Sequence, residues 1–87
     1  MFQGKYEEAD VLNTRAIEIQ EKALGPDHPS LATSLTTRSW LLKTKGKYEE
    51  ADVLNRRAIE IQEKALGPDH PSLATSLELR AWLLNSQ

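Results

Sequence analysis

The sequence contains no cysteine among its 87 residues, so no disulfide can form, and cysteine usage does not indicate an oxidising or a reducing compartment. Aromatic residues make up only 6%, and no apolar run approaches the roughly 20 residues that span a bilayer. The net charge of −2 provides neither a basic surface for a nucleic-acid backbone nor a strong field at a membrane. The opening residues, MFQGKYEEAD, lack the apolar stretch of a signal peptide. We therefore expect an intracellular, cytoplasmic protein that binds neither nucleic acid nor membrane.

The main feature of the sequence is a tandem repeat. Residues 4–45 align without a gap with residues 46–87, a period of 42 residues. The two copies differ at seven positions: Thr14/Arg56, Thr36/Glu78, Thr37/Leu79, Ser39/Ala81, Lys43/Asn85, Thr44/Ser86 and Lys45/Gln87. Fixed periods of about 20–50 residues are typical of stacked supersecondary units. The sequence therefore predicts one repeat domain over residues 1–87, with repeat 1 at 4–45 and repeat 2 at 46–87.

Each repeat contains two helical patterns. Residues 5–24 place their apolar side chains on one arc of roughly 160°, with charged residues opposite. In residues 29–45, Leu31, Leu35 and Leu42 form a narrow apolar stripe. We expect helices at about 5–24, 29–45, 47–66 and 71–86, which is an all-α fold of tandem antiparallel helix pairs.

The stretch ALGPDHPSLATSL occurs at residues 23–35 and again at 65–77, and it places an acid beside an imidazole. A metal site needs three or four converging ligands, and one histidine per copy does not supply them. Each residue instead fits a joint between helices. Gly25 can cap the first helix, Pro26 prevents its continuation, Asp27 or His28 can cap the second, and Pro29 suits its first position. We expect a joint, with no metal and no cofactor.

The GKYEEA turn and the ALGPDHP joint at a 42-residue period resemble tetratricopeptide repeats of the kinesin-light-chain type. The resemblance implies A helices at 29–45 and 71–86 and B helices at 5–24 and 47–66. The order is then B-A-B-A, as in a fragment of an α-solenoid, and MFQ would be the remainder of an A helix. Ser39 and Ala81 match the small position where helix A meets helix B.

This resemblance implies a non-catalytic protein–protein interaction scaffold. A peptide or protein segment would bind the concave face of the stacked A helices. The sequence shows no phosphate-binding loop, no Ser/His/Asp set and no pair of inward carboxylates, so we do not expect an enzyme. Trp40 and Trp82 either anchor a ligand in this groove or pack on a neighbouring helix. The candidate groove residues are Thr33, Thr36, Thr37, Trp40, Lys43, Thr75, Glu78, Leu79 and Trp82.

An alternative function is a self-assembling structural unit that associates end to end or by helix exchange. The B-A-B-A order leaves one apolar face uncovered at each end, and two repeats are fewer than the number that is normally stable alone. A homo-oligomer is therefore expected. The end residues are Tyr6, Ala9, Leu12 and Ile19 on the first helix, and Leu73, Leu77 and Leu84 on the last.

Two polar residue types depart from the family pattern. Arg38 lies beside the apolar stripe of its helix, and Asn13 and Asn55 lie on the facing B-helix stripes. An unpaired polar group buried there would cost several kcal/mol. We expect the guanidinium to donate to an Asn carbonyl, a Glu or the backbone. The alternative is that Arg38 extends into water without such a bond.

Overall fold

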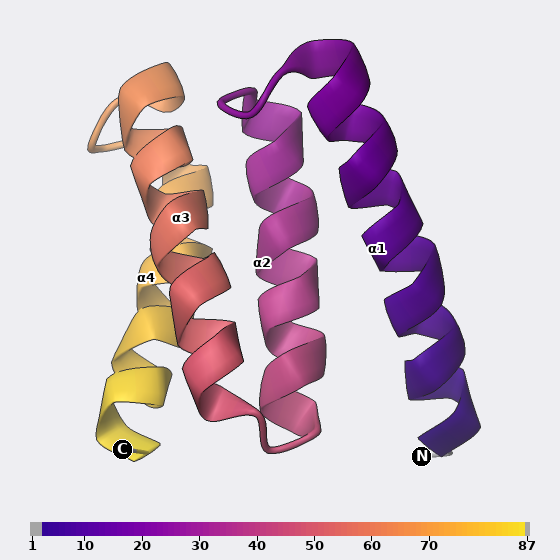
Figure 1. Cartoon of the computed structure of the whole chain (residues 1–87). Coiled ribbons are helices and arrows are strands. Elements are labelled where there is room, and N and C mark those ends of the chain that lie inside the picture. The colour runs from indigo at the N-terminus through magenta and orange to yellow at the C-terminus, as the bar shows by residue number, and fades with distance from the viewer. Residues whose placement is uncertain (1–2, 87) are drawn as a thin grey trace.

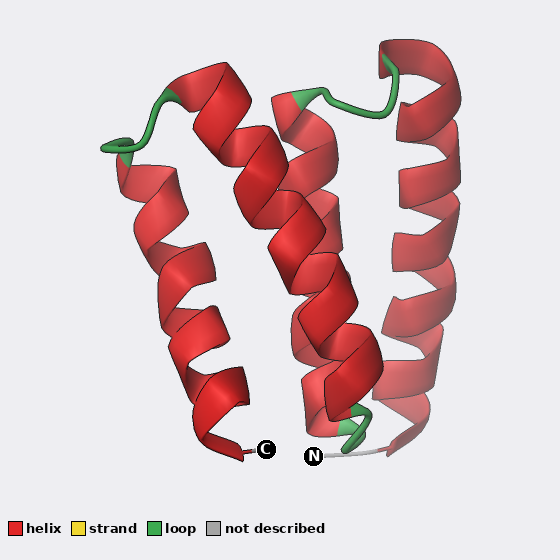
Figure 2. Ribbon diagram, turned by 60° about the vertical axis from the view of Figure 1, so that its left-hand side comes forward, coloured by secondary structure: helices red, strands yellow, loops and turns green. Residues whose placement is uncertain are grey.

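The computed structural model describes residues 3–86, which form four helices in sequence: α1 (Gln3–Leu24), α2 (Pro29–Thr44), α3 (Tyr48–Leu66) and α4 (Pro71–Ser86). Successive helices run antiparallel and are joined by short turns (Figures 1 and 2). The predicted all-α fold of tandem helix pairs is confirmed. Met1 and Phe2, in the expected remainder of an A helix, lie outside the described residues, as does Gln87. None of the helices within residues 3–86 has both the length and the apolar character that a bilayer crossing requires.

The ALGPDHP stretch forms a helix-to-helix joint. Gly25 ends α1 at a φ of 89°, a conformation that favours glycine, and its amide donates to the Glu21 carbonyl at 3.1 Å. His28 caps α2, because its Nδ1 accepts a hydrogen bond from the Ser30 amide at 3.1 Å. Pro29 is the first residue of that helix. The second copy makes the corresponding bond at His70. The histidines therefore act as helix caps, and the predicted joint is confirmed.

The core lies between the two central helices, α2 and α3, with α1 and α4 on the outside (Figure 1). The core consists of two apolar clusters, and Leu54 packs against both of them. One cluster consists of Ile17, Leu31, Ala32, Leu35, Ala58 and Ile61, and the other of Leu42, Ala51, Leu79 and Leu83. Both clusters take residues from α2 and α3, so the contact between these two helices is the main apolar interface. We call this interface the α2–α3 joint; it is distinct from the ALGPDHP joint, which is a turn between helices.

Two leucines on α4 lie elsewhere than predicted. Leu79, expected in the groove, is only 1% exposed and packs against Leu42 and Ala51. Leu73, expected at an open end, is only 2% exposed. Within the described residues α4 packs against α3 and α2, and both side chains lie on the side that these helices cover. Helical periodicity identifies an apolar stripe, but it does not say which neighbour covers each edge of that stripe.

Polar side chains inside the apolar faces connect neighbouring helices in the same way in both repeats. Asn55 Nδ2 donates to the Ser76 carbonyl at 3.0 Å, and the Ser76 hydroxyl donates to Gln62 Oε1 at 2.7 Å. Asn13 and its partners on α1 and α2 repeat the pattern. The helix pair α1–α2 and the helix pair α3–α4 therefore each carry a hydrogen-bonded Asn–Ser–Gln set, which specifies the alignment of the two helices.

The expected acceptors of Arg38 were wrong, although the guanidinium does bond across a helix interface. Arg38 pairs with Asp10 on α1 and also donates to Thr14 Oγ1 at 2.6 Å. Arg80 pairs with Asp52 in the second copy. The charged acceptor is thus an aspartate, one helical turn before the asparagine that was one of the expected acceptors.

Candidate functional site

A groove runs between the two A helices, α2 and α4. Its hollow has a volume of about 340 Å³. It is lined by Thr33, Thr36, Thr37, Trp40, Gln62, Ser72, Thr75 and Ser76. We call this surface the α2–α4 groove. Five of these eight residues are among those that the sequence indicated, and they come from both repeats.

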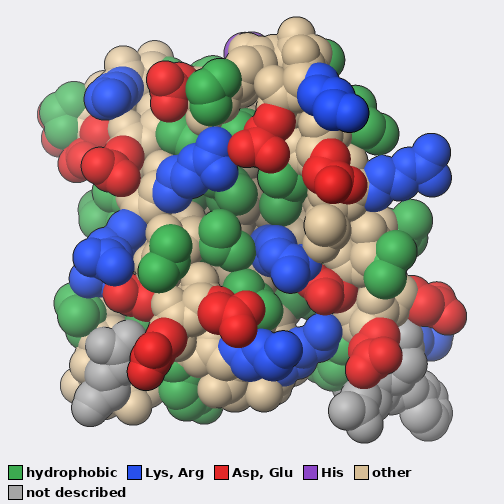
Figure 3. Space-filling view, viewed as in Figure 1, with side chains coloured by type: hydrophobic (Ala, Val, Ile, Leu, Met, Phe, Trp, Pro, Cys, Tyr) green, Lys and Arg blue, Asp and Glu red, His purple; other side chains and the backbone are tan. Residues whose placement is uncertain are grey.

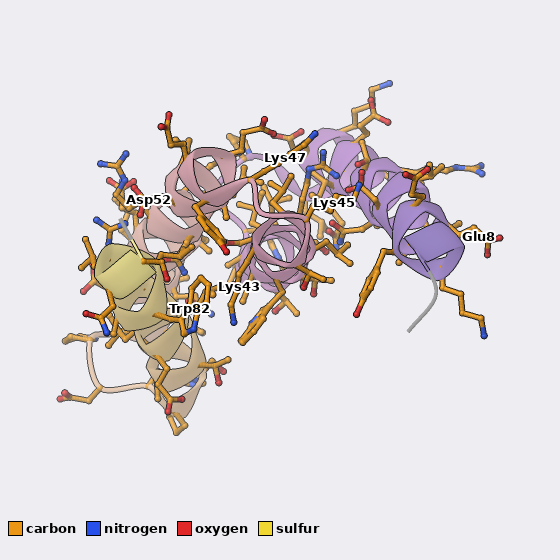
Figure 4. The ribbon with its side chains drawn as sticks, turned by 90° about the horizontal axis from the view of Figure 1, so that it is seen from below. Glu8, Lys43, Lys45, Lys47, Asp52 and Trp82 are labelled. Carbon is orange, nitrogen blue, oxygen red and sulfur yellow. The ribbon has the colours of Figure 1, made fainter. Side chains whose placement is uncertain are left out.

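Two tryptophans and a lysine flank the groove. Lys43 Nζ lies 4.0 Å from the ring centroid of Trp40, one turn earlier on α2, and 4.0 Å from that of Trp82 on α4. Figure 4 shows Lys43 and Trp82 pointing into the space between these two helices. The Trp82 ring also meets Tyr48 edge to face, with centroids 5.4 Å apart. The cation–π contact between Lys43 and Trp82 links α2 and α4, two helices that make few other contacts with each other.

Each tryptophan combines packing with exposure. Trp40 is 43% exposed and Trp82 is 40% exposed. Each therefore keeps ring surface open to solvent while one part of it contacts Lys43. Both roles considered from the sequence, packing on a neighbour and presentation of a ring, are compatible with this geometry.

Apart from Trp40, the side chains that line the groove end in hydroxyl or amide groups, and none of the lining side chains is ionisable. Thr36 Oγ1 bonds to the Ala32 carbonyl at 3.0 Å, and Thr37 Oγ1 bonds to the Thr33 carbonyl at 3.1 Å. The Thr37 hydroxyl thus uses its proton on its own helix and keeps lone pairs that can accept a bond, whereas Thr36 Oγ1 also lies 3.3 Å from Ser76 Oγ on α4. The surface is suited to hydrogen bonding with a polar partner and lacks the groups that acid–base catalysis uses.

A model of the tetratricopeptide repeat family matches residues 1–64. The chain belongs to the tetratricopeptide repeat family. The 42-residue period is compatible with the kinesin-light-chain-like class. A search of curated proteins gave no match. Tetratricopeptide repeats are in general protein–protein interaction scaffolds and are typically non-catalytic.

Some groove residues of this tetratricopeptide repeat protein were not predicted from the sequence. Gln62 is only 5% exposed, and its position inside the apolar arc of its helix was the one available signal. Ser72 and Ser76 carry no such signal, because only the packing of α4 beside α2 and α3 brings them to the groove. Glu78, which was predicted, is exposed on α4 but does not line the hollow.

The opposite side of the tetratricopeptide repeat pair has a larger hollow of about 750 Å³ between α3 and α4. Three arginines line it, but they are paired: Arg56 and Arg80 with Asp52, and Arg57 with Glu21. Acidic and basic side chains are intermixed on the face shown in Figure 3, so no single sign dominates there. No three His, Cys, Asp or Glu residues within residues 3–86 gather as metal ligands.

Proposed function

We propose that the chain binds a peptide or protein segment in the α2–α4 groove. The observation that supports this function is the hollow between α2 and α4, lined mainly by hydroxyl and amide side chains, next to two tryptophans that remain 43% and 40% exposed. Large, partly exposed aromatic rings beside a concave surface are the residues that most often dominate binding energy. Neither ring is needed to fill the described apolar core, which leaves both available to a partner.

The chemistry of the groove favours an extended polar segment with one apolar or aromatic side chain. That side chain would stack on the open surface of Trp40 or Trp82, and main-chain amides of the segment would donate to the threonine hydroxyls. Lys43 stands between the rings and adds one positive charge at the edge of the groove. A segment with a carboxylate near its aromatic residue is therefore favoured over one with a cation there.

A peptide-display selection tests this function. Peptides selected on the folded chain should bind Trp40→Ala at least about tenfold more weakly, since an aromatic anchor contributes roughly 2 kcal/mol or more. Thr75→Arg should also block binding, by filling the groove. Val53→Ala is the matched control, because Val53 is exposed on α3 outside the groove. Far-UV circular dichroism should show that all variants keep their helices. Selected peptides that bind the groove variants as well as the parent chain would disprove the proposal.

A second function, self-association through the end faces, is supported by a comparison of equivalent positions in the two repeats. Leu77 is 47% exposed and Leu84 is 56% exposed on α4, whereas their equivalents Leu35 and Leu42 on α2 are 1% and 3% exposed. At the other end Ile19 is 55% exposed and its equivalent Ile61 is 3% exposed.

Among the remaining end residues, Leu12 and Ala9 are more exposed than their equivalents Leu54 and Ala51, but Tyr6 matches Tyr48, and Leu73 is buried like Leu31. Leu12 is 67% exposed, whereas Tyr6 and Ala9 are half-buried. The two end faces therefore carry the same side chains that the α2–α3 joint buries. Fully burying an exposed leucine contributes roughly 1.5–3 kcal/mol, so covering each half-exposed leucine contributes about half of that, which favours an association that covers both faces.

A further inference from the structure

We infer that a second copy of the chain docks its α1 against α4 in the arrangement that α3 has against α2. This inference rests on the second function proposed above and specifies its partner and its contacts. The template lies within the molecule: α2 and α3 form the joint, and α4 and α1 carry the equivalent residues at the two ends. The 42-residue offset translates each contact of the α2–α3 joint into an expected contact between copies.

An ion pair identifies the partner face most specifically. Arg57 Nη2 on α3 donates to Glu21 Oε2 on α1 at 3.1 Å and to the Pro26 carbonyl at 3.4 Å. The equivalents of Arg57 and Glu21 are Arg15 and Glu63. Both are exposed, and neither forms an ion pair with another described residue. In the docked pair, Arg15 of the second copy would meet Glu63 of the first.

The contact between copies lacks two contacts that connect repeat 1 to repeat 2 within the chain. Ser39 Oγ donates to the Ala51 carbonyl at 2.7 Å across α2 and α3, but Ala81 takes the place of this serine on α4. Lys43 bridges Trp40 and Trp82, but Asn85 takes the place of this lysine. All but one of the differences between the repeats fall within residues 36–45 and their copies, the part of the A helix that contributes these contacts. The association should therefore be weaker than the internal joint and reversible.

The docking is head to tail, because the two faces differ and one chain carries both. Such contacts extend into open assemblies unless the rotation closes a ring. The mass should therefore rise continuously with concentration instead of stopping at a dimer. A dimer formed by helix exchange would stop at two chains.

Sedimentation velocity and light scattering of the full chain over a wide concentration range test the inference. Arg15→Glu and Glu63→Arg should each weaken association by about three- to tenfold, since a half-exposed ion pair is replaced by like charges. The Arg15→Glu/Glu63→Arg double variant should recover the association. Lys22→Glu is the control, because the equivalent position, Lys64, stays exposed in the internal joint.

The opposite experiment restores the missing contacts. Ala81→Ser and Asn85→Lys should each tighten association by about fivefold, the effect of one hydrogen bond or one cation–π contact. Ser86→Thr is the control, since it also restores a repeat-1 residue but at an exposed position whose equivalent, Thr44, bonds only within its own helix.

Each outcome decides the inference. Charge reversal that weakens association, its recovery in the double variant and the gain from Ala81→Ser support it. If charge reversal at Arg15 or Glu63 does not weaken association, or if the mass stops at two chains, this arrangement is wrong. Self-association itself would still be supported. A monomer at every concentration, including in the strengthened variants, overturns both self-association and the inference, and it leaves the groove proposal untouched.

Discussion

The repeat provides a matched pair of substitutions, Leu35→Ala and Leu77→Ala, that separates local sequence from tertiary context. Both leucines end the same SLATSL segment of an A helix. Leu35 is 1% exposed and packs in the cluster formed with residues of α1 and α3. Leu77 is 47% exposed on the outer side of α4. Helix propensity changes equally at the two sites, so any difference in stability arises from packing.

The two substitutions should differ by several kcal/mol in the free energy of unfolding. Leu35→Ala removes a fully buried side chain and leaves a cavity, which costs about 2.7–5 kcal/mol. Leu77→Ala removes a side chain that is already half in water and leaves no enclosed cavity, so it should cost about 1 kcal/mol or less. A domain of this size is stable by roughly 4–13 kcal/mol, so Leu35→Ala alone should consume a large part of that stability.

Urea unfolding followed by circular dichroism, at a few micromolar protein, measures both changes. The midpoint should fall sharply for Leu35→Ala and little for Leu77→Ala, with an unchanged slope in each case. Equal losses at this low concentration would refute the placement of Leu77 on an open face. The cost of Leu77→Ala should grow as the protein concentration rises, if copies cover this face.

Two further predictions concern polar contacts. His28→Ala should destabilise the chain by about 1 kcal/mol, because it removes the acceptor that caps α2, and His28→Asp should restore most of the loss; thermal unfolding measures both, and equal melting temperatures for all three chains would argue against the cap. Asp52→Ala should cost about 1–2 kcal/mol in urea unfolding, because it leaves the guanidinium of Arg80 without its partner at a partly buried interface. Glu50→Ala, at an exposed acid on the same helix, is the control and should change stability by less than about 0.5 kcal/mol; a loss as large as that of Asp52→Ala would contradict the role of the ion pair.

The sequence alone predicted most of the fold, because the signals involved are local. The caps and breakers at Gly25, Pro26 and Pro29 limit where a helix can start and stop, whatever surrounds them. The repeat then indicated that one helix pair stacks on the next, and the family match agrees. Most of the groove was also predictable, since Thr33, Thr36 and Trp40 lie opposite the leucine stripe of their helix.

What the sequence could not decide were the contacts between residues of different helices. The segments around Leu35 and Leu77 are nearly identical, but one leucine is buried and the other is exposed, because only one has a helix on both sides. Lys43 lies between two rings only because α4 brings Trp82 within 4.0 Å. Local sequence determined the helices and their ends, since a helix depends on neighbours within about four residues. The tertiary structure decided which faces are covered, because burial depends on partners a whole repeat away.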